Sequence, residues 1–234
     1  MAAQPLVQRA RRATSRELEG IPWWGLLSEV QRWEVAAELK VLDAQPGDVI
    51  CKVGRPATYW FGVLDGLMKM SNDPSVGYTI TFTGIPPGAW FGEGTLLKAE
   101  AYRYNIEALR RTVVAGLSAP TFNWLLETSI PFNRYVMNQL NERLGQFIAA
   151  REVDRINDPD TRVARSLAAL FNPVLYPNDS SVLRITQQEL AYLVGLSRQR
   201  VNSSLKALCD LQLIRVDYGG LKVLDLAGLR SFRA

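Results

Sequence analysis

Residues 186–208, with the sequence TQQELAYLVGLSRQRVNSSLKAL, place the tightest constraint on how this chain can fold. Thr186 can cap a first helix, and Glu189, three residues later, completes a capping box. Gly195 stands where a turn favours glycine, because glycine adopts a left-handed backbone at little cost. Ser197 can then cap a second helix whose apolar residues recur at helical spacing. The segment therefore predicts two short amphipathic helices joined by a three-residue turn.

The spacing within this pair predicts a helix-turn-helix, the motif that places its second helix in the major groove of DNA. The exposed face of that second helix is cationic and rich in amides, and it carries no acidic residue before Asp210. Arginine suits the acceptors of guanine, and glutamine or asparagine suits the edge of adenine. The alternative is an ordinary helical hairpin, which usually carries Glu/Lys pairs there. The residues expected to contact duplex DNA are Thr186, Gln187, Ser197, Arg198, Gln199, Asn202, Ser203 and Lys206.

The charge of the chain is divided unevenly along its length. From Asp160 to Ala234 there are ten Lys and Arg against six Asp and Glu, which accounts for the whole net charge of +4. The first 159 residues carry seventeen charges of each sign. A neutral first part followed by a basic part is typical of a sensory domain joined to a domain that binds phosphate groups.

Several kinds of site are excluded by the absence of histidine and by the presence of only two cysteines, Cys51 and Cys209. A histidine-ligated haem, an imidazole-ligated zinc and a histidine general base all require a residue that the chain lacks. Two thiols cannot hold a four-thiolate iron–sulfur cluster, and we expect both to be free. No P-loop or dinucleotide fingerprint follows a predicted strand, so the sequence predicts neither an enzyme nor a metal site.

The sequence also predicts a protein that does not enter a membrane. The arginines at residues 9–12 are not followed by an apolar core of signal-peptide length, and no uncharged run reaches about 18 residues. We therefore expect a cytoplasmic protein. The arginine run itself is interpreted as a frayed, solvated end of the chain.

The pattern of apolar and turn-forming residues changes at Val41, where a region that we expect to be β-structure begins. From there to Ser118, short apolar runs alternate with turn signals such as NDPSVG at 72–77 and IPPGAWFGEG at 85–94. Short strands separated by glycine and proline turns predict an antiparallel sandwich or barrel. Together with a helical segment before it, this region forms an expected sensory domain over residues 1–130.

A long helix is predicted over residues 131–157, where apolar residues recur at steps of three and four. Its narrow seam can pack on the β-rich domain or pair with the same seam of a second copy, and both can hold along different faces. Because helix-turn-helix proteins usually bind DNA as dimers, we expect a homodimer. The residues expected at the dimer interface are Val136, Leu140, Leu144, Phe147 and Ile148.

The long helix is expected to end at Asn157-Asp158-Pro159, because proline cannot continue the hydrogen-bonding pattern of a helix. Asp158 can then cap the next helix. Residues 158–234 form the expected DNA-binding domain. Beyond the helix-turn-helix, two apolar runs flank a turn at residues 218–220 and predict the hairpin wing of a winged helix.

A β-rich half, a long helix, a hinge and a winged helix-turn-helix, in that order, resemble the Crp/Fnr family of bacterial transcription regulators. The motifs that carry the resemblance are residues 185–208, FGEGTLL at 91–97 and DPDTRVARSLAAL at 158–170. The resemblance implies an α+β chain whose first half is a jelly roll of the cyclic-nucleotide-binding type. It also implies RNA polymerase as a partner, through a surface loop that corresponds to residues 172–181.

The resemblance further implies an effector pocket, but the phosphate-binding part of that pocket is altered here. Gly92 and Glu93 match the Gly-Glu pair that meets the ribose in members that bind cyclic AMP. Those members then use an Arg-Ser pair for the cyclic phosphate. One count along the chain places Arg103 and Tyr104 at that pair, and another places Tyr102 and Arg103 there. Either way the pair is broken, and Glu93 and Arg103 could instead form structural ion pairs.

The part of the pocket that meets adenine is altered as well. Phe147 and Ile148 lie at the level of the hydroxyl side chains that grip adenine in those members, and neither can form a hydrogen bond. We therefore expect an effector other than cyclic AMP, either a small molecule in an aromatic pocket or none at all. The alternative functions are a cyclic-nucleotide-responsive regulator and a regulatory module that does not read DNA.

Overall fold

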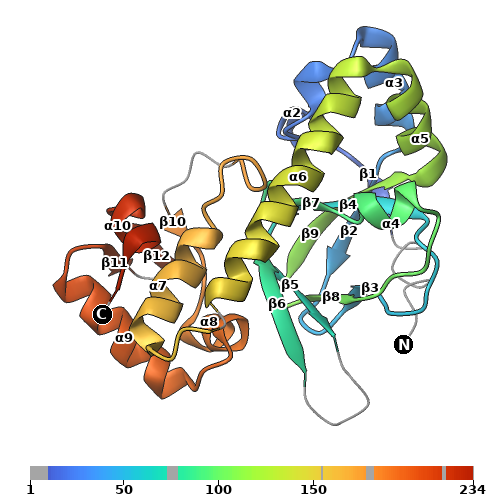
Figure 1. The fold of residues 1–234 in the computed structure, drawn as a ribbon. Coiled ribbons are helices and arrows are strands. Elements are labelled where there is room, and N and C mark those ends of the chain that lie inside the picture. The colour runs from blue at the N-terminus through green and yellow to red at the C-terminus, as the bar shows by residue number, and fades with distance from the viewer. Residues whose placement is uncertain (1–9, 73–78, 154, 178–181, 218–219, 234) are drawn as a thin grey trace.

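The computed structural model describes residues 10–72, 79–153, 155–177, 182–217 and 220–233. A sheet domain, a long helix and a smaller C-terminal domain follow one another along the chain (Figure 1). This order confirms the predicted fold class. Most of the predicted turn at residues 72–77 and the tip of the predicted wing at residues 218–219 lie outside the described residues.

Two antiparallel sheets form the N-terminal domain that is predicted to be the sensory domain, with strand orders β1-β2-β9-β4-β7 and β3-β8-β5-β6. Their apolar faces meet in a core that includes Phe61, Met70 and Ile106, as a jelly roll requires. The strands are β1 (Arg11–Arg12), β2 (Lys40–Ala44), β3 (Val49–Cys51), β4 (Tyr59–Asp65), β5 (Met68–Asn72), β6 (Ile80–Ile85), β7 (Trp90–Phe91), β8 (Asn105–Ala108) and β9 (Thr112–Ser118).

A second core lies between the sheet β1-β2-β9-β4-β7 and the helices packed on it. It is unusually aromatic: Trp60 packs against Trp90 with ring centroids 4.5 Å apart, and Trp23, Phe122 and Phe132 surround this pair. Aromatic pairs in such offset and edge-on arrangements add to the stability gained by burial alone. The helices are α2 (Ser15–Glu19), the 3-10 turn η1 (Trp24–Leu26), α3 (Glu29–Glu38), α4 (Glu93–Leu97) and α5 (Ala119–Thr128).

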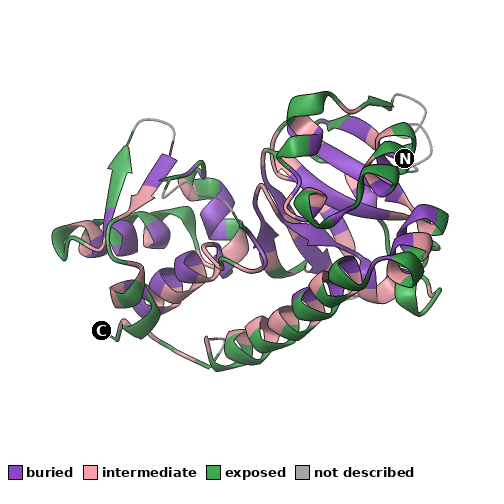
Figure 2. Cartoon of the chain, turned by 90° about the horizontal axis from the view of Figure 1, so that it is seen from above, coloured by how far each residue is buried: buried purple, intermediate pink, exposed green. Residues whose placement is uncertain are grey.

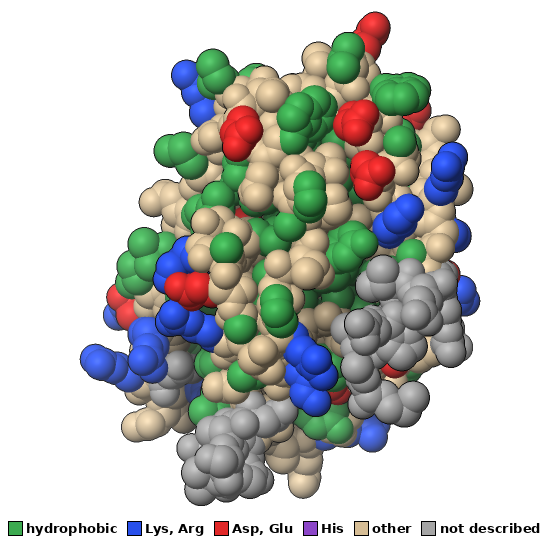
Figure 3. Space-filling view, turned by 90° about the vertical axis from the view of Figure 1, so that its right-hand side faces the viewer, with side chains coloured by type: hydrophobic (Ala, Val, Ile, Leu, Met, Phe, Trp, Pro, Cys, Tyr) green, Lys and Arg blue, Asp and Glu red, His purple; other side chains and the backbone are tan. Residues whose placement is uncertain are grey.

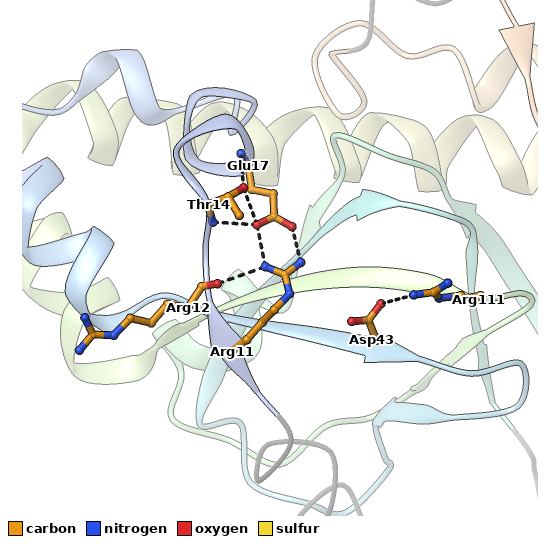
Figure 4. A network of polar contacts seen from close by, with 6 residues as sticks. All are labelled: Arg11, Arg12, Thr14, Glu17, Asp43 and Arg111. Atoms are coloured by element: carbon orange, nitrogen blue, oxygen red, sulfur yellow. Dashed lines mark hydrogen bonds and ion pairs between the residues drawn. The ribbon is translucent and has the colours of Figure 1, made fainter.

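The end of the arginine run is not frayed, contrary to the prediction, because Arg11 and Arg12 pair with β2 as strand β1. Both residues are exposed, and Arg9 lies outside the described residues. Arg11 donates from two nitrogens to the two oxygens of Glu17, at 2.8 and 2.5 Å (Figure 4). Glu17 also completes the capping box of α2 with Thr14. This partner is six residues away in sequence, so no local pattern revealed it.

This ion pair predicts a pH-dependent contribution to stability. Hydrogen bonds from Arg11 lower the pKa of Glu17 to about 2, below an ordinary value of about 4.3. A carboxylate whose pKa is lowered by folding stabilises the fold above its unfolded pKa, and the contribution is lost as the pH falls towards 2. Glu17→Gln keeps the capping box and should lower the free energy of unfolding at pH 7 by about 0.5–1 kcal/mol. Denaturant titration should show this difference vanish near pH 2, and Glu19→Gln, an exposed neighbour, is the control.

The long helix α6 (Ile130–Val153) runs along both domains, and much of its surface is exposed or half-buried (Figure 2). It ends earlier than the predicted residue 157, since residues 155–158 are not helical. Asp158 caps the next helix as predicted, accepting from the Thr161 backbone N–H at 2.6 Å. In the part of the chain that the structure describes, no helix has the length and apolar character needed to cross a membrane.

The C-terminal domain is a helical cluster with a small sheet of order β10-β12-β11. Its hairpin β11–β12 is the predicted wing, with Ile214 opposite Val223 and Asp217 opposite Gly220. Both cysteines of the chain are free, as predicted. The elements are α7 (Pro159–Ala169), β10 (Val182–Leu183), α8 (Gln187–Val194), α9 (Arg198–Asp210), β11 (Ile214–Asp217), β12 (Gly220–Val223) and α10 (Leu226–Ser231).

Candidate DNA-binding surface and effector pocket

Local capping defines the helix-turn-helix formed by α8 and α9. The Thr186 hydroxyl accepts from the Glu189 backbone N–H at 3.2 Å, and the Glu189 carboxylate accepts from the Thr186 backbone N–H at 2.7 Å. Gly195 ends α8 with a φ of 66°, in the left-handed region that favours glycine. Ser197 then caps α9 by accepting from the Arg200 backbone N–H. The predicted caps and turn are thus confirmed.

The inner face of α9 is held against the rest of the domain by apolar and polar contacts. Val201 and Leu205 are buried in the core. Arg200 is bound to Asp160 of α7 at 2.9 Å, and the Ser204 hydroxyl donates to the same carboxylate at 2.6 Å. Sequence reasoning missed this role of Asp160, because Asp160 and Arg200 lie 40 residues apart in the chain. These contacts set the direction in which the outer face of α9 points.

The outer face of α9 carries the predicted base-reading residues. Near its N-terminal end, the Gln187 side chain donates to the Asn202 side chain at 2.8 Å, which orders one amide of this surface. The hydroxyls of Thr186 and Ser197 serve as helix caps, so their predicted contacts with DNA are additional to a structural role. Five exposed side chains on α9 are among those predicted to contact DNA: Arg198, Gln199, Asn202, Ser203 and Lys206. Asp210, at the far end of the helix, is exposed as well.

A cavity of about 940 Å³ lies between β6, α4 and α6, where the effector pocket was predicted. Aromatic rings of Phe82, Phe91 and Tyr104 form part of its wall. Burial raises the pKa of Tyr104 to about 12, so this side chain is a neutral phenol at ordinary pH. The cavity brings together all of the residues predicted for the pocket, which are Gly92, Glu93, Arg103, Tyr104, Phe147 and Ile148.

Glu93 forms an ion pair with Arg143 at the wall of this cavity. Gly92 has a φ of 95° and is the N-cap of α4. Glu93, the first residue of that helix, is only 2% exposed. Arg143 of α6 donates from Nε to Glu93 Oε1 at 3.0 Å and from Nη2 to the Trp90 carbonyl at 2.6 Å. Sequence reasoning missed Arg143, because an arginine off the apolar seam of a helix usually lies in solvent.

The cation predicted to face a phosphate stands instead at the cavity mouth. The Arg103 side chain is 77% exposed and is bound to Glu100 at 2.9 Å. Lys98 is bound to the same carboxylate at 2.6 Å. Tyr102 does not line the cavity, because its ring is buried in the sheet core and its hydroxyl donates to the Tyr59 carbonyl at 3.3 Å. Neither way of counting therefore gives a buried arginine for a cyclic phosphate.

The residues predicted for the dimer interface divide between two faces of α6. Val136 is 1% exposed and belongs to the aromatic core of the same chain, so it offers no free surface for the predicted contact with a second copy. Leu140 and Phe147 are half-buried against the sensory domain. Leu144 and Ile148 are each 60% exposed on the other face, and Met137, which the sequence analysis missed, is 62% exposed beside them.

Comparison with known proteins matches each half of this architecture. The family model for the cyclic nucleotide-binding domain matches residues 41–129, and the model for the Crp-like helix-turn-helix domain matches residues 161–232. The chain belongs to the Crp/Fnr family of transcription regulators. It carries the cyclic-nucleotide-binding-like domain and the DNA-binding helix-turn-helix of that family.

Relatives with known names support the same family over most of the chain. Transcriptional regulator SdrP of Thermus thermophilus is 29% identical over 193 residues, which cover 79% of this chain and 90% of SdrP. The cAMP-activated global transcriptional regulator CRP of Haemophilus influenzae is 27% identical over 167 residues, covering 69% of this chain and 73% of CRP. The structure of FixK2 from Bradyrhizobium japonicum has the same fold, with a TM-score of 0.64, 16% identity, and coverage of 84% of this chain and 99% of FixK2.

Proposed function

We propose that this regulator is a homodimer that recognises a specific DNA sequence through α9. The observation that carries the proposal is the outer face of α9, where the exposed side chains Arg198, Gln199 and Asn202 lie together on a capped recognition helix. The excess of positive charge in the same domain favours DNA through the phosphates.

Selection of binding sites from random duplex DNA tests this function. Enriched sites should contain two inverted half-sites about 34 Å apart, one turn of DNA, because a two-fold dimer presents two recognition helices. Affinity should fall steeply with salt. Recovery of no enriched sequence would count against the proposal, as would recovery of single half-sites alone. An interaction with RNA polymerase through residues 172–181 stays a prediction, and residues 178–181 lie outside the described part of this loop.

A stripe on α6 supports the dimer. Met137, Leu144 and Ile148 are seven and four residues apart, so they lie on one face of the helix. Each is well exposed in the single chain. Figure 3, which labels no residue, shows further apolar side chains exposed between charged ones on one side of the molecule. An exposed apolar stripe with heptad-like spacing on a 24-residue helix is suited to pairing with a second copy.

We also propose that the effector is not cyclic AMP, although two of the relatives are named for activation by that nucleotide. A cyclic phosphate needs a cation facing it, and Arg103 is instead exposed and bound to Glu100. Adenine needs polar partners at its edge, since a buried polar group without a partner costs about 1–3 kcal/mol. Phe147 and Ile148 cannot supply them. The aromatic wall favours a ligand with an apolar body.

Calorimetry with cyclic AMP and cyclic GMP, each at up to about millimolar concentration, should show no binding at micromolar affinity. The physical reason is that Arg103 is exposed and bound to Glu100. In addition, Phe147 and Ile148 offer no hydrogen bond to adenine. Micromolar binding that disappears in Arg103→Ala but persists in Arg111→Ala would contradict this expectation. Arg111 is a suitable control because it is an exposed arginine of the same domain and lies outside the cavity.

A further inference from the structure

Strands β5 and β6 of the sensory domain lie against α8, where Lys69 stands over the Tyr192 ring. In addition, the sensory domain contacts the C-terminal domain of its own chain through two turns. The turn between β4 and β5 places Leu67, which is fully buried, in a core whose other buried members belong to the C-terminal domain. The turn between β8 and β9 carries Arg110, whose Nε donates to Glu189 Oε1 at 2.9 Å while Nη2 binds Glu189 Oε2. Glu189 is the residue that completes the capping box of α8.

Hydrogen bonds join these two turns to each other, so together they form one contact surface for the C-terminal domain. The Leu109 backbone N–H donates to the Leu67 carbonyl at 3.0 Å. The Thr112 hydroxyl accepts from the Leu67 backbone N–H at 3.2 Å and donates to the Arg110 carbonyl at 2.9 Å. Arg110 is therefore held at the point where it meets α8. Because its two-nitrogen contact with a carboxylate fixes direction as well as distance, the contact restrains the orientation of α8.

This contact surface leaves the reading face of α9 free. Arg198, Gln199 and Lys206 are exposed in the same structure in which Arg110 binds Glu189. The contact therefore does not block DNA. A dimer must present two recognition helices at a set separation. A DNA-binding domain that swivels about the non-helical residues 155–158 would lose that freedom on binding, which costs free energy. A contact that restrains the domain beforehand therefore strengthens DNA binding.

We propose that Arg110 is a positioning residue for DNA recognition: with Leu67, it docks the helix-turn-helix onto the sensory domain of the same chain through Glu189. This inference rests on the proposed DNA-binding function. It adds a sensory-domain residue to the determinants of operator affinity. It also gives the sensory domain a direct route to the first helix of the DNA-binding motif, separate from the hinge.

Two charge-removing variants test the proposal. For one of them, Glu189→Gln, simple attraction to DNA and docking predict opposite changes in operator affinity. Arg110→Ala removes the sensory partner. Glu189→Gln removes the other charge but keeps the capping box, which glutamine also forms. Docking predicts that both variants weaken operator binding, by about 10-fold each, and that the double variant is no weaker than either single variant. Attraction to phosphates alone predicts that Glu189→Gln tightens binding.

Arg111→Ala is the matched control, since it removes the same charge from the same turn but its partner is Asp43 of β2. The affinity of Arg111→Ala for the selected operator, measured by fluorescence anisotropy, should stay within about twofold of that of the unmodified protein. Small-angle scattering without DNA should give a larger radius of gyration for Arg110→Ala and Glu189→Gln. Equal affinities for Arg110→Ala and Arg111→Ala, or tighter binding by Glu189→Gln, would overturn the inference. Failure of the unmodified protein to bind any selected duplex would instead overturn the proposed function.

Discussion

Replacing Leu144 with glutamate should convert the proposed dimer to monomers and abolish tight operator binding. Leu144 lies between Met137 and Ile148 on the exposed stripe of α6. Burial of one such side chain contributes about 1.5–3 kcal/mol, and a two-fold interface counts each contact twice. The introduced carboxylates, one from each copy, would also place two like charges near the axis, where desolvation adds to their repulsion. Sedimentation velocity, run at concentrations at which the unmodified protein is dimeric, measures the result.

Asn138→Glu provides a matched control for this experiment. Asn138 is also exposed on α6, but it lies about a quarter turn away from the line through Met137 and Leu144. The same charge on the same helix should therefore leave the dimer intact. If Leu144→Glu sediments as a dimer, the stripe is not the interface. If Asn138→Glu separates the copies equally well, the interface is broader than the stripe.

Features set by local chemistry were predicted from the sequence correctly. The caps at Thr186, Ser197 and Asp158 and the turn at Gly195 depend on residues within four positions of one another. A capping side chain can bond only to nearby backbone groups, so its sequence spacing nearly determines its structure. The alternating apolar runs of the sheet domain were readable for a similar reason, since a strand repeats every two residues.

Features set by distant partners could not be predicted in the same way. Helical spacing placed Val136 and Leu144 in one seam, but only the packed sheet domain shows that the first is covered and the second exposed. Arg143 meets Glu93 across 50 residues, and Arg110 meets Glu189 across 79. An arginine on a predicted surface gives no sign of which carboxylate it will find, because that choice belongs to tertiary packing. The same limit applies to Arg103, whose partner Glu100 keeps it at the mouth of the cavity.

Replacing Arg198 with alanine should weaken operator binding by about 1–3 kcal/mol and relax the preference at one base pair in each half-site. Arg198 is the first residue of α9, the end of a recognition helix that enters the major groove. Its side chain is exposed and forms no salt bridge among the described residues, so its guanidinium is available to the two acceptors of guanine. A selection from random duplex DNA, repeated with the variant, measures the preference position by position.

Lys206→Ala separates base reading from attraction to phosphates. Lys206 is exposed two turns further along α9, and its single ammonium group suits a phosphate better than a pair of base acceptors. Its loss should weaken binding to all DNA sequences about equally, and should reduce the slope of log affinity against log salt by about 0.9. Arg198→Ala should instead change the ratio of specific to non-specific binding, because a base contact is lost only on the correct sequence. If the two variants lower affinity by the same factor on every duplex, Arg198 contacts the DNA backbone. The proposal that α9 reads bases through Arg198 is then wrong.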